Sequence, residues 1–286
     1  MKSATVEGLP PAPTLVIEPT HGWASPQLRA VWQYRELLYF LVWRDIKVRY
    51  KQTALGALWI LLQPVASMVV FGILFGQLLK APSGGAPYPL FVYAGLLPWN
   101  YFAGSLTRSS SRLVESAHLI TKVYFPRLVI PISGVLSGLV DFAVAFLVLL
   151  GLMIYYGVVP GLAVALLPAF MLLAIVIALG FGLWLAALNV RFRDINHLMP
   201  FLVQLWMYVT PVIYSSTLIP GRWRFLLGLN PMSGVIEGFR WALLGERLAA
   251  RPAGAPFATS IIVAVLVLVT GALFFRRTER TFADLV

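Results

Sequence analysis

Long runs of residues without a formal charge divide the chain into stretches that can cross a membrane. A transmembrane helix needs about 20 apolar residues to cross about 30 Å of hydrocarbon. The uncharged runs are Gln52–Leu79, Ala81–Thr107, Leu128–Val190 (interrupted only by Asp141), Ile195–Gly221 and Pro252–Phe275. The third run has 63 residues, so it holds two helices with a turn at Val159-Pro160-Gly161. The pattern predicts six transmembrane helices, at 54–79, 90–107, 128–156, 162–189, 198–216 and 257–275.

Helices are expected because a bilayer cannot hydrogen-bond the backbone of an open strand, whereas a helix satisfies its own backbone. The runs also exceed the ~10 residues of a strand in a membrane barrel. Composition agrees, since 59% of the residues are hydrophobic, 12% are charged and the mean hydropathy is +0.83. An average soluble domain carries about 25% charged residues. The expected fold class is an all-α integral membrane protein with six transmembrane helices.

Lysine and arginine are distributed unevenly between the two sides of these helices. Sixteen of the 22 lie in segments on the side of the two termini, and six lie on the other side. Because cytoplasmic segments are enriched in Lys and Arg, both termini are expected in the cytoplasm. Five of the six exceptions lie in one long loop, between the last two helices. The net charge of +11 is attributed to flanks that face anionic lipid, so nucleic acid is not expected as a partner.

Three further segments have their own character. Residues 1–25 are rich in Pro, Ala and Thr, and they are predicted to form a disordered cytoplasmic tail. Residues 26–51 mix aromatic and charged residues, which is typical of an amphipathic helix lying in the membrane interface; this helix either anchors the next span or docks a partner. Ser216–Pro256 contains a 12-residue apolar stretch, too short to span, which predicts re-entrant half-helices on the outer side.

The sequence lacks the motifs of several chemistries. No lysine follows the glycine that a phosphate-binding loop requires, so the chain is not expected to bind ATP by that route. The three histidines lie in separate segments and cysteine is absent, which predicts neither a metal site nor a cofactor in this chain. No nucleophile elbow occurs either. We therefore do not expect the chain to be an enzyme.

One acidic residue, Asp141, falls deep inside a predicted span. Ser133, Ser137 and Asp141 recur every four residues and share a helix face, beside the small pair Gly134 and Gly138. Two interpretations stand: a polar group of a pore or proton path, or a packing face whose acid is hydrogen-bonded by serine. The second is favoured, because a proton-coupled carrier is expected to contain more than one such group.

Aromatic residues cluster beside two prolines within the spans. Pro98 and Pro211 are expected to break their helices, which is tolerated at membrane depth where neighbours or a cavity satisfy the backbone. The nearby rings are candidates for a substrate channel, with an interfacial aromatic belt as the alternative. These candidates are Trp99, Tyr101, Phe102, Trp206, Tyr208 and Tyr214.

Five longer strings are more specific than composition. They are RDIKVRYKQTALGALWILLQP (44–64), GLLPWNYFAGSL (95–106), LITKVYFPRLVIP (119–131), NVRFRDINHLMPFLVQLWMYVTPVIY (189–214) and LNPMSGVIEGFRWALLG (229–245). Together they resemble the membrane subunit of ABC type-2 polysaccharide exporters, the permeases for O-antigen, capsule or teichoic acid chains. The resemblance runs in order from about residue 36 to 275, and an ABC type-2 transmembrane domain is assigned to 52–286.

This resemblance implies a homodimer in the bacterial cytoplasmic membrane, bound to separate ATPase subunits that hold ATP and Mg. It also implies a glycan on an undecaprenyl-type lipid as substrate. The segment that couples to the ATPase would be Ser116–Arg127, with candidate residues His118, Lys122, Tyr124, Phe125 and Arg127. The interface helix would be 26–51, and the outer gate helices would lie within Pro220–Leu248.

Two other functions are weighed against this one. A membrane glycosyltransferase or polymerase would need clustered acids or histidines on an outer loop, where only Glu237 and Glu246 occur. A drug or simple-lipid exporter could use the same permease fold. The sequence does not identify the polymer.

Overall fold

The computed structural model describes residues 28–51, 58–245, 248–249, 254–279 and 282. The predicted tail, 1–25, lies outside the described residues, as do residues 26–27 of the predicted interface helix. Within the described ranges every regular element is a helix, as the fold class predicts.

The helices follow one another along the chain with short connections. Their bounds are α1 Leu28–Gln33, α2 Arg35–Lys51, α3 Leu58–Phe71, π-helical η1 Gly72–Leu78, α4 Tyr88–Glu115, α5 Ala117–Lys122, α6 Val129–Leu136, α7 Gly138–Tyr155, η2 Leu162–Leu166, α8 Leu167–Arg191, α9 Ile195–Val209, η3 Ser216–Leu218, η4 Gly221–Trp223, α10 Arg224–Leu229, α11 Pro231–Leu244 and α12 Gly254–Thr278.

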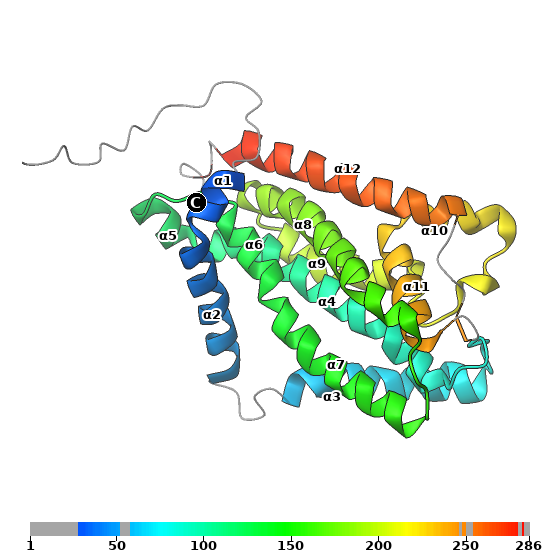
Figure 1. The fold of residues 1–286 in the computed structure, drawn as a ribbon. Coiled ribbons are helices and arrows are strands. Elements are labelled where there is room, and N and C mark those ends of the chain that lie inside the picture. Colours follow the sequence, from blue (N-terminus) through cyan, green and yellow to red (C-terminus); the bar gives the residue numbers. More distant parts are fainter. Residues whose placement is uncertain (1–27, 52–57, 246–247, 250–253, 280–281, 283–286) are drawn as a thin grey trace, which may run out of the picture.

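The long helices α4, α8 and α12 run side by side, and α4 and α12 both pack extensively on α8 (Figure 1). Helix α2 crosses one end of this bundle, near α1 and α5 and near the C-terminal end of α12. Helices α10 and α11 lie at the opposite end. We refer to these as the α5 end and the α11 end.

Four helical stretches in the described part of the chain are long and apolar enough to cross a membrane: Leu61–Leu78, Val129–Tyr155, Leu162–Arg191 and Gly254–Thr278. They coincide with four of the six predicted spans, and the predicted turn at 159–161 separates the middle two. The other two predicted spans fall on α4 and α9. The apolar part of α4 is diluted by Tyr, Trp, Asn and Pro, and α9 has only 15 residues. The count of six stays a prediction.

The two prolines singled out in the sequence behave differently. Pro211 ends its helix as expected: α9 stops at Val209, and Thr210 has an extended backbone because the residue before proline avoids helical angles. Pro98 does not break its helix, so that prediction is wrong; α4 continues from Tyr88 to Glu115 with Pro98 inside. Proline removes one backbone hydrogen bond, and here α4 is packed against α3, α8 and α11, which hold it on several sides.

Buried apolar residues form two clusters. The larger one surrounds α4, α8 and α11, and 13 of the 14 residues of α11 are buried. The smaller one lies at the α5 end and gathers residues from six separate parts of the chain, represented by Leu41, Leu113, Phe125, Leu183, Phe275 and Phe282. The smaller cluster therefore joins α2, α4, the segment after α5, and the C-terminal residues.

Candidate functional site

Asp141 is the centre of an ion-pair cluster at the α5 end. Its carboxylate accepts hydrogen bonds from the Arg49 guanidinium and from the Tyr50 hydroxyl, both on α2. Nη1 of Arg108, on α4, lies 3.6 Å from the same carboxylate. Burial, followed by the hydrogen bond with Asp141, raises the pKa of Tyr50 to about 12, so this hydroxyl remains a proton donor at neutral pH. The intramembrane acid is thus paired with arginine.

The serine expected to satisfy Asp141 has another partner. Ser137 Oγ donates to the Gly134 carbonyl, three residues back on its own helix, at 3.1 Å. Hydroxyls in helices commonly make this local bond, which leaves them unavailable to other side chains. The shared face predicted from the spacing of Ser133, Ser137 and Asp141 therefore does not supply the bond to the acid. The pairing with Arg49 and Arg108 also reduces the case for a free acidic group in a pore.

A second acid, Asp45, lies on α2 one turn before Arg49, the partner of Asp141. Asp45 has only 4% of its surface exposed and accepts a hydrogen bond from Arg112 of α4; Arg44 lies 3.3 Å away. Asp45 and Arg49 are four residues apart on α2, as Arg108 and Arg112 are on α4, so each pair shares a face. Two charged turns of α2 therefore meet the charged end of α4.

Gly138 creates the space for this arrangement. A Cβ atom at position 138 would collide with the Arg108 guanidinium and would lie 2.7 Å from Ser105 Oγ. Arg108 also donates to Ser105 Oγ at 3.2 Å and to the Gly134 carbonyl at 3.1 Å. The glycines at positions 134 and 138 thus leave room for the Arg108 side chain between α4 and the consecutive helices α6 and α7.

The predicted ATPase-coupling residues differ in how much of their surface is exposed. His118, Lys122 and Tyr124 are exposed, and Tyr124 keeps 67% of its surface accessible. Phe125 is buried in the smaller cluster, with 7% exposed. The Arg127 guanidinium donates to the Glu279 main-chain carbonyl. Of these five residues, the first three present accessible surface at this end of the bundle.

The predicted channel aromatics lie mostly inside the bundle. Trp99, Phe102 and Trp206 form one cluster: ring centroids are 5.5 Å apart for Trp99–Phe102 and 4.9 Å for Phe102–Trp206. Tyr101 packs apart from them, edge to face on Phe142, and donates to the Val135 carbonyl at 3.3 Å. Tyr208 is half exposed on α9. The structure therefore brings Trp99, Phe102 and Trp206 together. Another of the six rings, Tyr208, lies on a surface.

The remaining aromatic, Tyr214, satisfies the end of α9. Its hydroxyl donates to the carbonyls of Tyr208 at 3.2 Å and Val209 at 3.3 Å, while Thr210 Oγ1 donates to the Trp206 carbonyl at 2.6 Å. The last carbonyls of a helix have no partner within the helix. These side chains replace the backbone donors that are lost beyond Pro211.

The segment that follows α9 is held by a buried arginine that sequence reasoning did not single out. Arg240 of α11 is 4% exposed and makes four hydrogen bonds, all to main-chain carbonyls: Phe91 at 3.2 Å, Pro211 at 2.7 Å, Tyr214 at 3.3 Å, and Val212. Its guanidinium also lies 3.7 Å from the Phe91 ring centroid. Tyr88 donates to the one carbonyl between, Ile213, at 2.6 Å. All four carbonyls from 211 to 214 are thereby satisfied.

Two neighbours complete this Arg240 junction, which we define as Arg240, Tyr88 and residues 210–214. A Cβ at Gly95 would lie 2.6 Å from the Arg240 guanidinium, so only glycine fits there. Asn230, at the start of α11, accepts from Met232 N and from Trp206 Nε1, and it donates to Thr210 Oγ1 at 2.8 Å. The junction was detectable in principle, because an arginine between Phe239 and Trp241 needs buried acceptors.

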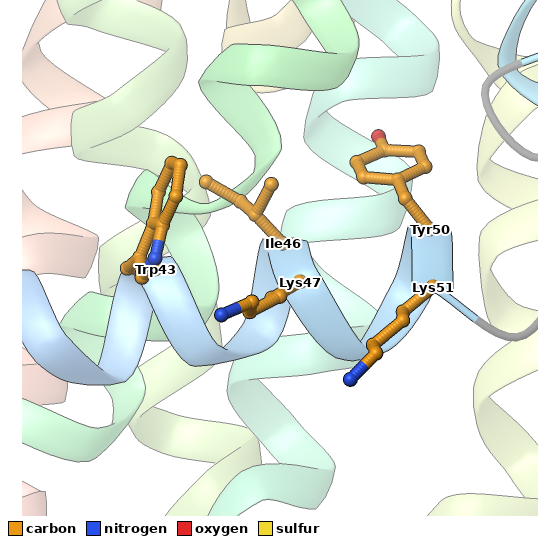
Figure 2. Close-up of a pocket in the computed structure, with 5 residues that line it drawn as sticks. All are labelled: Trp43, Ile46, Lys47, Tyr50 and Lys51. Atoms are coloured by element: carbon orange, nitrogen blue, oxygen red, sulfur yellow. The ribbon is translucent and has the colours of Figure 1, made fainter.

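A shallow hollow of about 260 Å³ lies along α2, lined by Trp43, Ile46, Lys47, Tyr50 and Lys51. Figure 2 shows Trp43, Ile46 and Tyr50 projecting from one side of the helix and the two lysines from another. Trp43 is half exposed. Apolar rings beside basic side chains are typical of a helix at the level of lipid headgroups. In the described ranges no group of three His, Asp or Glu residues could hold a metal ion.

Comparison with known proteins identifies the family. The ABC-2 type transporter family matches residues 36–244. A permease protein of an O-antigen export system in Myxococcus xanthus is 33% identical over 259 residues, which cover 90% of this chain and 98% of that protein. A protein of the same name in Klebsiella pneumoniae is 28% identical, with 88% and 95% covered. A polysialic acid transport protein of Escherichia coli is 25% identical over 206 residues, 70% of this chain and 78% of the other. The chain is a multi-pass membrane protein and belongs to the ABC-2 type transporter family.

Proposed function

We propose that this chain is the permease subunit of an ATP-driven exporter that moves a lipid-linked polysaccharide across the bacterial cytoplasmic membrane. The observation that carries the proposal is the similarity to an O-antigen export permease over 98% of that protein's length. The Escherichia coli relative, named for polysialic acid transport, also handles a glycan polymer by its name. The substrate we propose is a glycan on an undecaprenyl-type lipid.

We propose six membrane crossings, and the geometry of α4 and α9 supports the two that hydropathy alone leaves open. The 28 residues of α4 extend about 42 Å at 1.5 Å per residue, which exceeds the hydrocarbon thickness. The 15 residues of α9 extend only about 22 Å. Residues 210–214 follow it in the chain, and their satisfied carbonyls allow a non-helical backbone at membrane depth.

Helices α10 and α11 fit a re-entrant pair in this scheme. They have 6 and 14 residues, so neither crosses the membrane, and Asn230 makes the turn between them. Helix α11 packs on α4, α8 and α12 at one end of the bundle. Since α2 and the C-terminal end of α12 lie at the other end (Figure 1), we assign the α5 end to the cytoplasm and the α11 end to the outside.

The energy source in this proposal is a separate ATPase subunit, which holds ATP and Mg and docks at the α5 end. Exposed His118, Lys122 and Tyr124 offer a mixed polar and aromatic surface, which suits a cleft on a partner. A second copy of the chain completes the exporter. The half-exposed Tyr208, with the exposed apolar residues of α9 around it, is proposed to line the polymer path between the two copies.

Reconstitution tests the function. The chain is co-purified with an ABC ATPase partner, placed in vesicles, and supplied with lipid-linked glycan on the ATPase side. We expect ATP-dependent appearance of the glycan on the other side, and no ATP hydrolysis by the permease alone. Robust hydrolysis by the isolated chain, or export of a simple lipid in preference to the glycan, would contradict the proposal.

Cysteine labelling tests the topology, which is convenient because the sequence contains no cysteine. Leu218→Cys and Val123→Cys place single thiols on exposed positions at the two ends of the bundle. A membrane-impermeant reagent applied outside intact cells is expected to label the first and not the second. Labelling of both positions, or of position 123 alone, would contradict six crossings with cytoplasmic termini.

A further inference from the structure

The C-terminal residues contact the predicted coupling segment in a way that assigns them a role. Glu279 follows α12 and accepts two hydrogen bonds through its side chain: from the Arg127 backbone N–H at 3.3 Å, and from Arg276 Nη1 at 2.6 Å. The Arg127 guanidinium donates to the Glu279 main-chain carbonyl. Arg127 and Glu279 are therefore joined by both side-chain and main-chain groups, although 152 residues separate them.

A buried ring reinforces this contact. Phe282 is fully buried and packs edge to face on Phe275, with centroids 5.3 Å apart. The Arg127 guanidinium lies 6.0 Å from the Phe282 ring. Phe125 belongs to the same apolar cluster as Phe282. Both residues that flank Pro126 are thus engaged with the C-terminal end of α12 or with its apolar surroundings.

Arg127 lies between the exposed residues of the predicted coupling segment and the start of α6, so its contacts can transmit a displacement of that segment. The exposed residues Lys122 and Tyr124 lie just before Arg127, and α6 begins two residues after it. The Ile130 N–H donates to the Arg127 carbonyl at 3.2 Å, so Arg127 is already part of the first turn leading into α6. A force applied to Tyr124 must pass through Phe125 and Arg127 to reach either helix.

We propose that Glu279 is a positioning residue for the ATPase-docking segment 116–127. Oriented by Arg276, its carboxylate fixes Arg127, so that displacement of the docking segment by the ATPase moves α6 and α12 together. Without Glu279 the segment still docks, but its displacement is no longer passed to α12. This inference rests on the proposed docking role of residues 116–127.

The proposal is tested in the assembled exporter with Glu279→Ala, Glu279→Gln and Arg276→Ala. Glutamine can still accept the Arg127 N–H, and Arg276→Ala leaves that bond intact, so both are expected to be milder. Loss of a charge-assisted hydrogen bond shifts such a contact about tenfold, so we expect export per ATP hydrolysed to fall at least about threefold in Glu279→Ala. Glu36→Ala, which removes an exposed carboxylate of α2, serves as the matched control and is expected to leave this ratio unchanged.

A spectroscopic measurement reports on the segment directly. A spin label on Val123→Cys, which is 56% exposed, is expected to become more mobile when combined with Glu279→Ala and to stay unchanged with Glu36→Ala. If Glu279 matters only for folding, the amount of assembled complex falls while export per ATP and label mobility stay constant. That result would overturn the proposal. Should Glu279→Ala not accumulate, Glu279→Gln and Arg276→Ala carry the same comparison.

Cross-linking separates this inference from the proposed function. Val123→Cys, an exposed position beside Tyr124, is cross-linked to the ATPase in the otherwise unchanged exporter. Absence of a cross-link contradicts docking at 116–127, and the role of Glu279 is then rejected with it. If the cross-link forms and Glu279→Ala exports with an unchanged ratio and unchanged label mobility, docking stands and the positioning role is rejected.

Discussion

Arginines hold both ends of the helix bundle, but with opposite chemistry. At the α11 end, Arg240 is almost fully buried and bonds only to main-chain carbonyls within the described residues. At the α5 end, Arg49, Arg108 and Arg112 face the carboxylates of Asp45 and Asp141, and their side chains keep 15–28% of their surface exposed. The same residue type therefore stabilises a loop break at one end and joins separate helices at the other.

This difference implies different mechanical properties. Main-chain carbonyls do not change charge with pH. The buried Arg240 guanidinium donates to four of them, and no equivalent set of acceptors lies nearby among the described residues. Partly exposed ion pairs are weakened by salt and can exchange partners, as the two arginines around Asp141 illustrate. We infer that the α11 end is fixed, whereas the α5 end, where the ATPase is proposed to dock, is adjustable.

The largest effect is expected from Arg240→Met, which preserves side-chain length and removes every donor. Four carbonyls lose a partner, three of them in a non-helical segment, and the free energy of unfolding should fall by about 3 kcal/mol or more. Thermal unfolding in detergent, followed by size-exclusion chromatography, measures this. Arg222→Ala, at an exposed arginine beside Trp223, is the control. If Arg240→Met is as stable as the wild type, the claim that Arg240 fixes the α11 end is rejected.

The second prediction separates fixed and adaptable residues within the α5 end. Phe125→Ala should lower stability by about 3 kcal/mol, since it empties a buried position. Tyr124→Ala should leave stability within about 0.5 kcal/mol and weaken ATPase association, because this ring is exposed. Thermal unfolding and co-purification of the ATPase measure the two effects. Unchanged association in Tyr124→Ala together with Phe125→Ala would refute the assignment of the docking segment.

Asp141→Asn tests whether the α5 end depends on charge. The substitution leaves Arg49 and Arg108 close together without a carboxylate, which should lower stability by about 1–2 kcal/mol after allowance for partial exposure. Added salt screens the repulsion, so the loss should shrink at high ionic strength. Thermal unfolding at low and high salt measures it, with Arg240→Met expected to show no comparable recovery. An equal salt response in both variants would erase the contrast between the two ends.

The smallest change in stability is expected for Tyr208→Ala, within about 0.5 kcal/mol, because the ring is half exposed. If Tyr208 lines the polymer path, export should fall while ATP hydrolysis and assembly persist. Trp206→Ala is the companion variant: it empties the contact with Phe102 and should lower stability as well. Normal export by Tyr208→Ala, alone and combined with Trp206→Ala, would place the path elsewhere.

The sequence predicts where the helices lie better than it predicts which side chains contact each other. Uncharged runs locate the helices because lipid requires apolar segments of fixed length, and the residue before Pro211 marks the end of α9 correctly. Asp141 is also detectable, as a lone acid in an apolar run. Its partners are not, because Arg49 and Arg108 come from α2 and α4, and only the tertiary packing brings them within reach. Local spacing suggests serine instead.

The aromatic residues show the same limit. Rings near Pro98 and Pro211 look alike in the sequence, yet Trp99 and Phe102 are buried, Phe102 against Trp206 of α9, while Tyr208 reaches a surface. Which side of a helix faces a neighbour depends on rotation about its axis, and a helix that is apolar all round does not encode that rotation. Arg240 could have been singled out from the sequence. It lies between Phe239 and Trp241 in an apolar stretch, and a buried guanidinium there requires hydrogen-bond acceptors.

The Arg240 junction also imposes an order on biosynthesis. The chain emerges from the ribosome with residues 210–214 before α11, so at that stage Tyr88 is in place to satisfy Ile213, while the other three carbonyls of the segment lack their donor. Lipid offers no substitute. We therefore expect the end of α9 to reach its final structure only after α11 has been synthesised. A chain truncated before Arg240 is expected to leave the carbonyls of Pro211, Val212 and Tyr214 without the donor that satisfies them in the complete bundle.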